Sequence, residues 1–220
     1  MLPLVLALGP SLILLVAIGA RRPAERICLA AASVAGFLAG VLVLELLPSW
    51  LARVRITAVS EWLQAVQISW SQAALPEETC KLLVLLAVAI PLRPSRAGWM
   101  RAGAVTGLGY AAFENLLHTA LRPDAVPLVL LRSLTSLPAH ALFGVFMGAL
   151  AGRGGLRSWL AAWLAAMALH TAYDTPLLLL SRRSQHDAHS WIAVGVLAAL
   201  LVGGWLTARH LARRLEATSN

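Results

Sequence analysis

Seven stretches of this sequence stay apolar over about 18 residues or more, and this feature limits the chain to a narrow class of folds. A helix rises about 1.5 Å per residue, so about 20 such residues cross the roughly 30 Å hydrocarbon layer of a membrane. Inside that layer a helix satisfies its own backbone hydrogen bonds within one segment. We therefore predict an all-α polytopic membrane protein with about seven transmembrane helices, over residues 2–20, 27–47, 70–92, 99–121, 128–150, 158–180 and 191–208.

The composition agrees with this class of protein. Hydrophobic residues make up 59% of the chain and charged residues 13%, against about 25% charged residues in soluble domains. The net charge of +8 comes from short arginine clusters between the apolar runs, so it requires no nucleic-acid partner. No soluble domain, repeat or linker interrupts the runs. We expect one integral membrane domain over residues 1–220, with a functional core at about 70–180.

The arginines also predict the orientation in the membrane. One set of alternate loops carries eleven arginines and the other carries six, with Arg132 counted in the smaller set. Loops rich in Arg and Lys stay on the cytoplasmic side. The N-terminus is therefore predicted outside and the C-terminus in the cytoplasm. The bias toward Arg, Ala and Leu favours a bacterial source, in which the location would be the cytoplasmic membrane.

Ionisable residues in the third run point to function. Glu77, Glu78 and Lys81 precede a purely apolar segment, and Lys81 is the one lysine of the chain. An ionised side chain at bilayer depth costs about 2.5–3.5 kcal/mol on insertion scales, so such residues are functional candidates. Positions three and four apart share a helix face, so the ammonium can reach both carboxylates. The alternative is an ordinary ion pair at the start of a helix on the membrane surface.

The next three runs carry further polar residues at similar depths. Glu114 and Asn115 follow a segment of small residues, and the alternative role for Glu114 is a structural pair with an arginine or with the lysine. His140 is a lone imidazole in an apolar run. His170 and Asp174 are four residues apart, so the carboxylate can orient the ring. We expect these four central runs to form a polar chamber that opens toward the extracytoplasmic side.

Four motifs occur in order within residues 73–178, about half of the chain. They are Glu77-Glu78-x-x-Lys81, a Gly-Leu-Gly-aromatic-Ala-Ala-x-Glu-Asn run that ends at Glu114-Asn115, His140-x-x-x-Gly144 and His170-x-x-x-Asp174. With these motifs the sequence resembles the PrsW family of intramembrane proteases, within the larger group that includes the CAAX-processing prenyl endopeptidases. Tyr110 stands where a phenylalanine is usual in that family.

The resemblance implies an endopeptidase that cuts membrane-anchored proteins, such as a single-pass anti-sigma factor. It also implies that Glu77 or Glu78 acts as general base on a water molecule, with the other glutamate in support. The histidines and Asn115 would stabilise the tetrahedral oxyanion. The full candidate catalytic set is Glu77, Glu78, Lys81, Glu114, Asn115, His140, His170 and Asp174, with Lys81 holding the glutamates and Asp174 orienting His170. No cofactor or metal is expected in this mechanism.

Two other functions remain open at this point. In the first, His140, His170 and one glutamate bind zinc and the second glutamate is the base, since these are acceptable zinc ligands. The HExxH spacing that would identify such a site is absent. In the second, the protein is a transporter or a scaffold whose buried charges form a proton relay or an ion site. No inverted repeat supports this second function.

Overall fold

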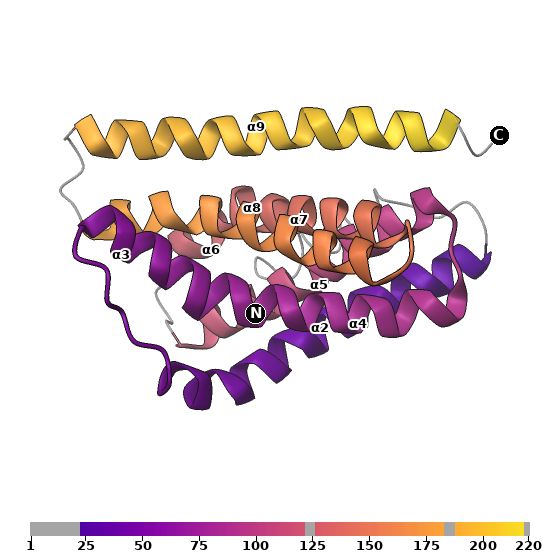
Figure 1. Cartoon of the computed structure of the whole chain (residues 1–220), viewed down its shortest axis with the longest axis horizontal. Coiled ribbons are helices and arrows are strands. Elements are labelled where there is room, and N and C mark those ends of the chain that lie inside the picture. The colour runs from indigo at the N-terminus through magenta and orange to yellow at the C-terminus, as the bar shows by residue number, and fades with distance from the viewer. Residues whose placement is uncertain (1–22, 122–125, 183–187, 218–220) are drawn as a thin grey trace.

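The fold is that of a computed structural model, which describes residues 23–121, 126–182 and 188–217. These residues form helices and short connections, and no strand occurs among them. The predicted all-α class is confirmed. The elements are α2 (Pro23–Leu51), α3 (Glu61–Ile68), the π-helical segment η1 (Ser69–Ala74), α4 (Leu75–Leu92), α5 (Arg96–Leu121), α6 (Val126–Leu134), α7 (Ser136–Ala151), α8 (Leu156–Arg182) and α9 (Ala188–Ala217) (Figure 1).

Within these described ranges, three segments are long and apolar enough to cross a membrane. They are Glu25–Leu51, Val126–Ala151 and Trp191–Arg214. The first predicted run, 2–20, lies outside the described residues. The runs at 70–92, 99–121 and 158–180 are helical but are not among the three. In α4 the reason is visible, because its 18 residues include two glutamates and a lysine.

Two predicted runs differ from the observed helices in a way that matters for the site. The third run belongs to a longer helical stretch, since α3, η1 and α4 follow one another without a break. The backbone N–H of Leu75 donates to the carbonyl of Trp70, which is the wider spacing of a π-helix. The fifth run, 128–150, is divided at Thr135 into α6 and α7. Both irregularities lie within a few residues of the polar side chains.

Close contact between α5 and α7 sets the centre of the bundle. A Cβ atom on Gly103 would clash with the carbonyl group of Gly144, and a Cβ on Gly144 would clash with that of Gly103. A Cβ on Gly107 would likewise clash with the carbonyl of His140. Small residues allow this backbone approach in membrane helices. The glycines of α5 therefore fix the position of the α7 backbone at His140.

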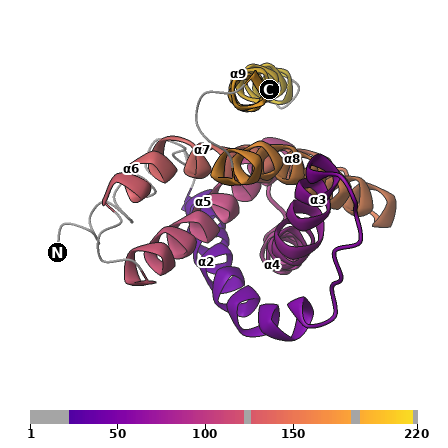
Figure 2. The same cartoon turned by 90° about the vertical axis from the view of Figure 1, so that its left-hand side faces the viewer.

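Helix α9 lies at the edge of the bundle. Figure 2, which views the molecule end on, shows α9 set apart on the outer side of α7 and α8. Only 11% of its candidate span is buried, against 72% for the span that contains α7. Gly204 is the point at which α9 approaches α7, since a Cβ there would clash with Leu142. Most of α9 is thus available to contact lipid.

Candidate active site

Charged and polar side chains from four helices meet inside the bundle. Helix α4 contributes three of them, and α5, α7 and α8 contribute the others. Hydrogen bonds and ion pairs connect Glu77, Glu78, Lys81, Glu114, His140, His170 and Asp174. The sequence singled out all seven, and the structure brings them together. Their catalytic roles stay predictions.

Lys81 lies at the middle of this cluster and is almost completely buried. Its Nζ atom lies 2.7 Å from Oε1 of Glu78 and 3.4 Å from Oε2 of Glu77, as the helical spacing predicted. The same Nζ lies 3.0 Å from Nδ1 of His140 and 4.0 Å from the ring centroid of Tyr110. An ammonium group has three N–H donors and no acceptor. The two carboxylates and the imidazole therefore accept all three donors.

The lysine fixes the tautomer of His140. Because Lys81 can only donate, Nδ1 of His140 must accept, and the ring proton is then on Nε2. Nε2 lies 3.0 Å from Oε2 of Glu114, so this N–H donates to the carboxylate. His140 thus connects the charges of α4 with the glutamate of α5.

His170 makes the corresponding connection on the other side of Glu78. Its Nδ1 lies 2.7 Å from Oε1 of Glu78, and its Nε2 lies 3.1 Å from Oδ2 of Asp174. An imidazolium would donate to both carboxylates. The ring of Phe143 stacks on the imidazole with centroids 5.1 Å apart. The predicted orientation of His170 by Asp174 is therefore present in the geometry.

A hydrogen bond between indole and hydroxyl anchors α8 against α4 close to the cluster. Nε1 of Trp163 donates to Oγ1 of Thr79 over 2.9 Å. Thr79 in turn donates to the carbonyl of Leu75 over 2.6 Å. Trp163 lies two helical turns before His170, so this bond holds the part of α8 that leads to the histidine.

Arg132 is a site residue that the sequence analysis missed. Its Nη2 lies 2.7 Å from Oε2 of Glu114, and its Nε donates to Oδ1 of Asn115 over 3.0 Å. The guanidinium also donates to Oγ of Ser136 over 3.1 Å. The assignment of Arg132 to a loop is wrong, because this residue lies in α6. The useful signal was a cation inside an apolar run, opposite a glutamate that needed a partner.

The arginine determines how Asn115 is oriented. The side-chain oxygen of Asn115 accepts from Arg132, so the amide NH₂ must point elsewhere. This nitrogen is buried, and no hydrogen-bond partner for it exists among the described residues. A buried donor without a partner is costly and calls for an explanation. It is available to an acceptor that the described residues do not supply.

The two adjacent glutamates have different environments. Glu78 is 0% exposed, and both Lys81 and His170 bind its Oε1. Glu77 is 13% exposed at its side chain, and its closest charged groups are Lys81 at 3.4 Å and His170 at 3.9 Å. Glu78 is therefore the more tightly held member of the pair. Glu77 is the carboxylate that is less tightly held and partly open to water.

The donor set also invites comparison with a metal site. Glu77, Glu78, His140 and His170 offer ligand atoms within 4.8 Å of one another, and zinc accepts these ligand types. The ammonium of Lys81, however, already binds three of the four residues. A zinc ion held by these residues at about 2.0–2.2 Å would compete with this ammonium for them. The arrangement therefore does not fit a metal unless Lys81 is withdrawn.

Comparison with known proteins adds one finding. A family model described as PrsW family intramembrane metalloprotease matches residues 24–203, which include every member of the cluster. The match therefore covers more than half of the chain. No match was found among the curated proteins or among the solved structures.

Proposed function

Because the chain belongs to the PrsW family of intramembrane metalloproteases, we propose that it is an endopeptidase that cuts membrane-anchored proteins. The substrate we propose is a single-pass protein such as an anti-sigma factor. Membership of a protease family supports a peptidase over the transporter or scaffold that the sequence alone left open. The buried cluster in α4, α5, α7 and α8 is where we place the chemistry.

We propose that Glu77 is the general base. It accepts a proton from a water molecule, whose oxygen then attacks the carbonyl carbon of the scissile peptide bond. When the tetrahedral intermediate collapses, the same proton passes to the leaving amine and the C–N bond breaks. Glu77 suits this role because its side chain is partly exposed and its contacts with charged groups are longer than those of Glu78. Glu78 remains ionised and holds Lys81 and His170 in position.

Stabilisation of the oxyanion is assigned to groups around Glu77. His140 and His170 lie with ring centroids 5.3 Å apart, and we place the substrate carbonyl beside them. The free NH₂ of Asn115 is a further donor for the substrate. Donors already oriented toward a developing negative charge are a major source of catalysis in hydrolases.

The single observation that carries this mechanism is the position of the Lys81 ammonium. It supplies the central positive charge of the site and binds three of the four residues that a metal would need. The four potential ligands and the family description favour a second candidate, a zinc-dependent protease. That candidate requires Lys81 to move away or to lose its proton. Metal analysis of the purified protein separates the two candidates.

We also propose a membrane topology for this enzyme. It has about seven spans in one domain over residues 1–220, with the core at about 70–180. The N-terminus is outside and the C-terminus is in the cytoplasm of a bacterial cell. The three apolar spans support a membrane location, and the shared depth of the polar groups in α4, α5, α7 and α8 supports further spans there. A polar chamber between these helices would admit the water and the substrate.

The experiment that tests the function needs no known substrate. Membrane and secreted proteins are compared by quantitative proteomics in cells with the wild type and in cells with Glu77→Gln at matched expression. We expect new protein termini in one or a few single-pass proteins with the wild type only. The control variant Glu45→Gln changes a carboxylate outside the cluster. Cells with this variant should show the same protein termini as cells with the wild type. Identical termini with the wild type and Glu77→Gln under envelope stress would contradict the proposal.

A further inference from the structure

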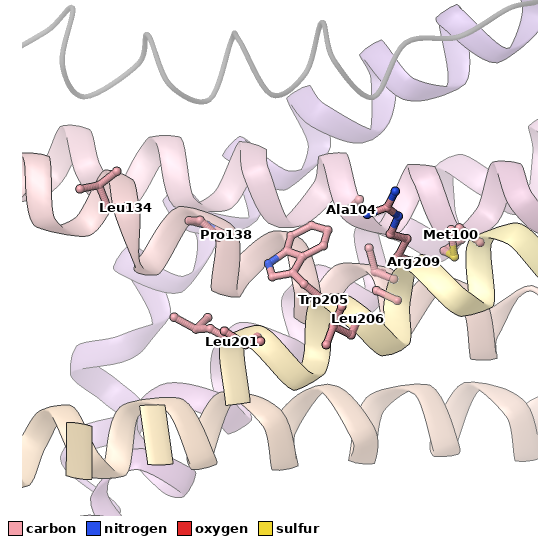
Figure 3. A pocket seen from close by; sticks show the side chains of 12 residues that line it. Met100, Ala104, Leu134, Pro138, Leu201, Trp205, Leu206 and Arg209 are labelled. Carbon is pink, nitrogen blue, oxygen red and sulfur yellow. The ribbon is translucent and has the colours of Figure 1, made fainter. Parts of the chain in front are cut away.

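A groove runs along the membrane-facing side of the bundle, away from the charged cluster. It lies between α9 and the pair α5 and α7, and its volume is about 740 Å³. Its walls include Met100, Ala104, Pro138, Leu201, Trp205 and Leu206 (Figure 3). All of these side chains are apolar or aromatic. Arg209 is the one charged residue of its lining.

Arg209 marks one end of the groove. Figure 3 places Arg209 and Met100 toward one end and Leu134 and Leu201 toward the other. Among the residues whose side chains the structure describes, no carboxylate forms an ion pair with Arg209. The nearby Arg101 differs, because it pairs with Glu25 over 3.0 Å. The groove therefore has an apolar body and a cationic end without a counterion among the described side chains.

Further arginines extend the positive charge beyond this end. Arg213 lies one helical turn after Arg209 on α9, and Arg96 lies one turn before Met100 on α5. All of them are exposed. They belong to the loops predicted on the cytoplasmic side, where the lipid surface is negatively charged. Basic pockets between helices on that side suit anionic lipid headgroups.

We propose that this groove binds one anionic phospholipid. The phosphate lies at Arg209 and Arg213, and an acyl chain lies along Leu201, Trp205 and Leu206. An extended peptide would leave its backbone hydrogen bonds unmet against these apolar walls, which disfavours it as the occupant. These apolar walls also contribute no favourable contact to a free phosphate ion. Only a ligand with an anionic head and a long apolar tail satisfies both parts of the groove.

The site would couple the lipid to the position of α9. This helix approaches α7 closely at Gly204, but only a small share of its span is buried, so the bundle alone packs weakly against it. A lipid that contacts α5, α7 and α9 together would fill the space between them. The proposal does not depend on proteolysis, and its test uses no substrate.

The experiment is native mass spectrometry of the purified full-length chain with equal amounts of phosphatidylglycerol and phosphatidylcholine. An arginine near the membrane surface contributes about 1 kcal/mol, or roughly fivefold, to binding of an anionic lipid. We expect the wild type to retain phosphatidylglycerol at least fivefold over phosphatidylcholine. Arg209→Gln with Arg213→Gln should bring this ratio close to one. Arg153→Gln, an exposed arginine outside the groove, should leave the ratio unchanged.

Two further measurements test the groove itself. Ala212→Trp fills the charged end with a large side chain and should reduce retention of both lipids. Glycerol phosphate should fail to displace phosphatidylglycerol, because it lacks the acyl chain. A wild-type ratio near one, or a ratio that survives the double arginine change, would overturn the proposal. So would a photo-crosslinker at position 206 that captures a protein segment in place of lipid.

Discussion

The ammonium of Lys81 lies 3.0 Å from Nδ1 of His140, and these two residues are 59 positions apart in the sequence. The contact makes His140 an acceptor toward α4 and a donor toward Glu114 on α5. Arg132 and Asp174 close the two ends of the resulting chain of polar contacts. Replacing one residue of this series changes the partners of its neighbours. Substitutions at different residues of the series should therefore have distinguishable effects.

Glu77 and Glu78 should respond differently to the same substitution. We expect Glu77→Gln to reduce cleavage by roughly 10²-fold or more, since it removes the general base, with little change in the unfolding temperature. Glu78→Gln removes the negative charge beside buried Lys81 and should cost about 3–5 kcal/mol of stability. Thermal unfolding in detergent and cleavage of a substrate found by proteomics measure both effects. Equal loss of stability in the two variants would contradict the assignment of roles.

Replacing Lys81 should change the metal-binding behaviour of the protein. In Lys81→Met the ammonium is gone, and Glu77, Glu78, His140 and His170 are left with ligand atoms within 4.8 Å of one another. We expect this variant to take up zinc while the wild type does not, because in the wild type the Lys81 ammonium binds Glu77, Glu78 and His140. Zinc content after dialysis, measured by elemental mass spectrometry, gives the result. Stoichiometric zinc in the wild type would contradict our interpretation.

Arg132 should act through Glu114. Arg132→Gln leaves the half-buried Glu114 carboxylate without its closest cation and should cost about 1–3 kcal/mol of stability. Adding Glu114→Gln removes the uncompensated charge, so we expect the double variant to be more stable than Arg132→Gln alone. A double-mutant cycle by thermal unfolding measures this coupling. Strictly additive effects would show that the 2.7 Å pair is energetically unimportant.

The sequence predicted much of the site because the relevant contacts are local or carried by motifs. Spacings of three and four residues gave the pairs within α4 and the pair of His170 with Asp174. Arg132 could not be found in this way. Its contacts with Asn115 and Glu114 are tertiary, and its position near the start of an apolar run resembles an ordinary loop charge.

The packing of α5 on α7 was equally difficult to predict in detail. The small residues of α5 are visible in the sequence, but which glycine faces which carbonyl group is not. The break at Thr135 was also missed, because the run 128–150 is long enough to be one helix. Such features depend on tertiary packing, which hydropathy does not report. The close contact of Gly103 with Gly144, which the sequence did not predict, is the clearest example.

That contact yields a stability prediction. Gly103→Ala places a Cβ against the carbonyl of Gly144 and should destabilise the protein by about 1–3 kcal/mol through overpacking. Gly195→Ala is the matched control, since no atom lies within 4 Å of the added Cβ. It should be neutral or stabilising by up to about 1 kcal/mol, because alanine favours helices. Equal unfolding temperatures for the two variants would contradict the close helix contact.

The most direct test of the central claim is proteolysis by the purified enzyme in liposomes after metal removal. The wild type is treated with a chelator, its residual metal is quantified, and cleavage of a proteomically identified substrate is followed beside Glu77→Gln. Our account predicts that the metal-free wild type keeps its full rate and that Glu77→Gln is inactive. Loss of activity on chelation with recovery on adding zinc, or full activity of Glu77→Gln, would contradict it.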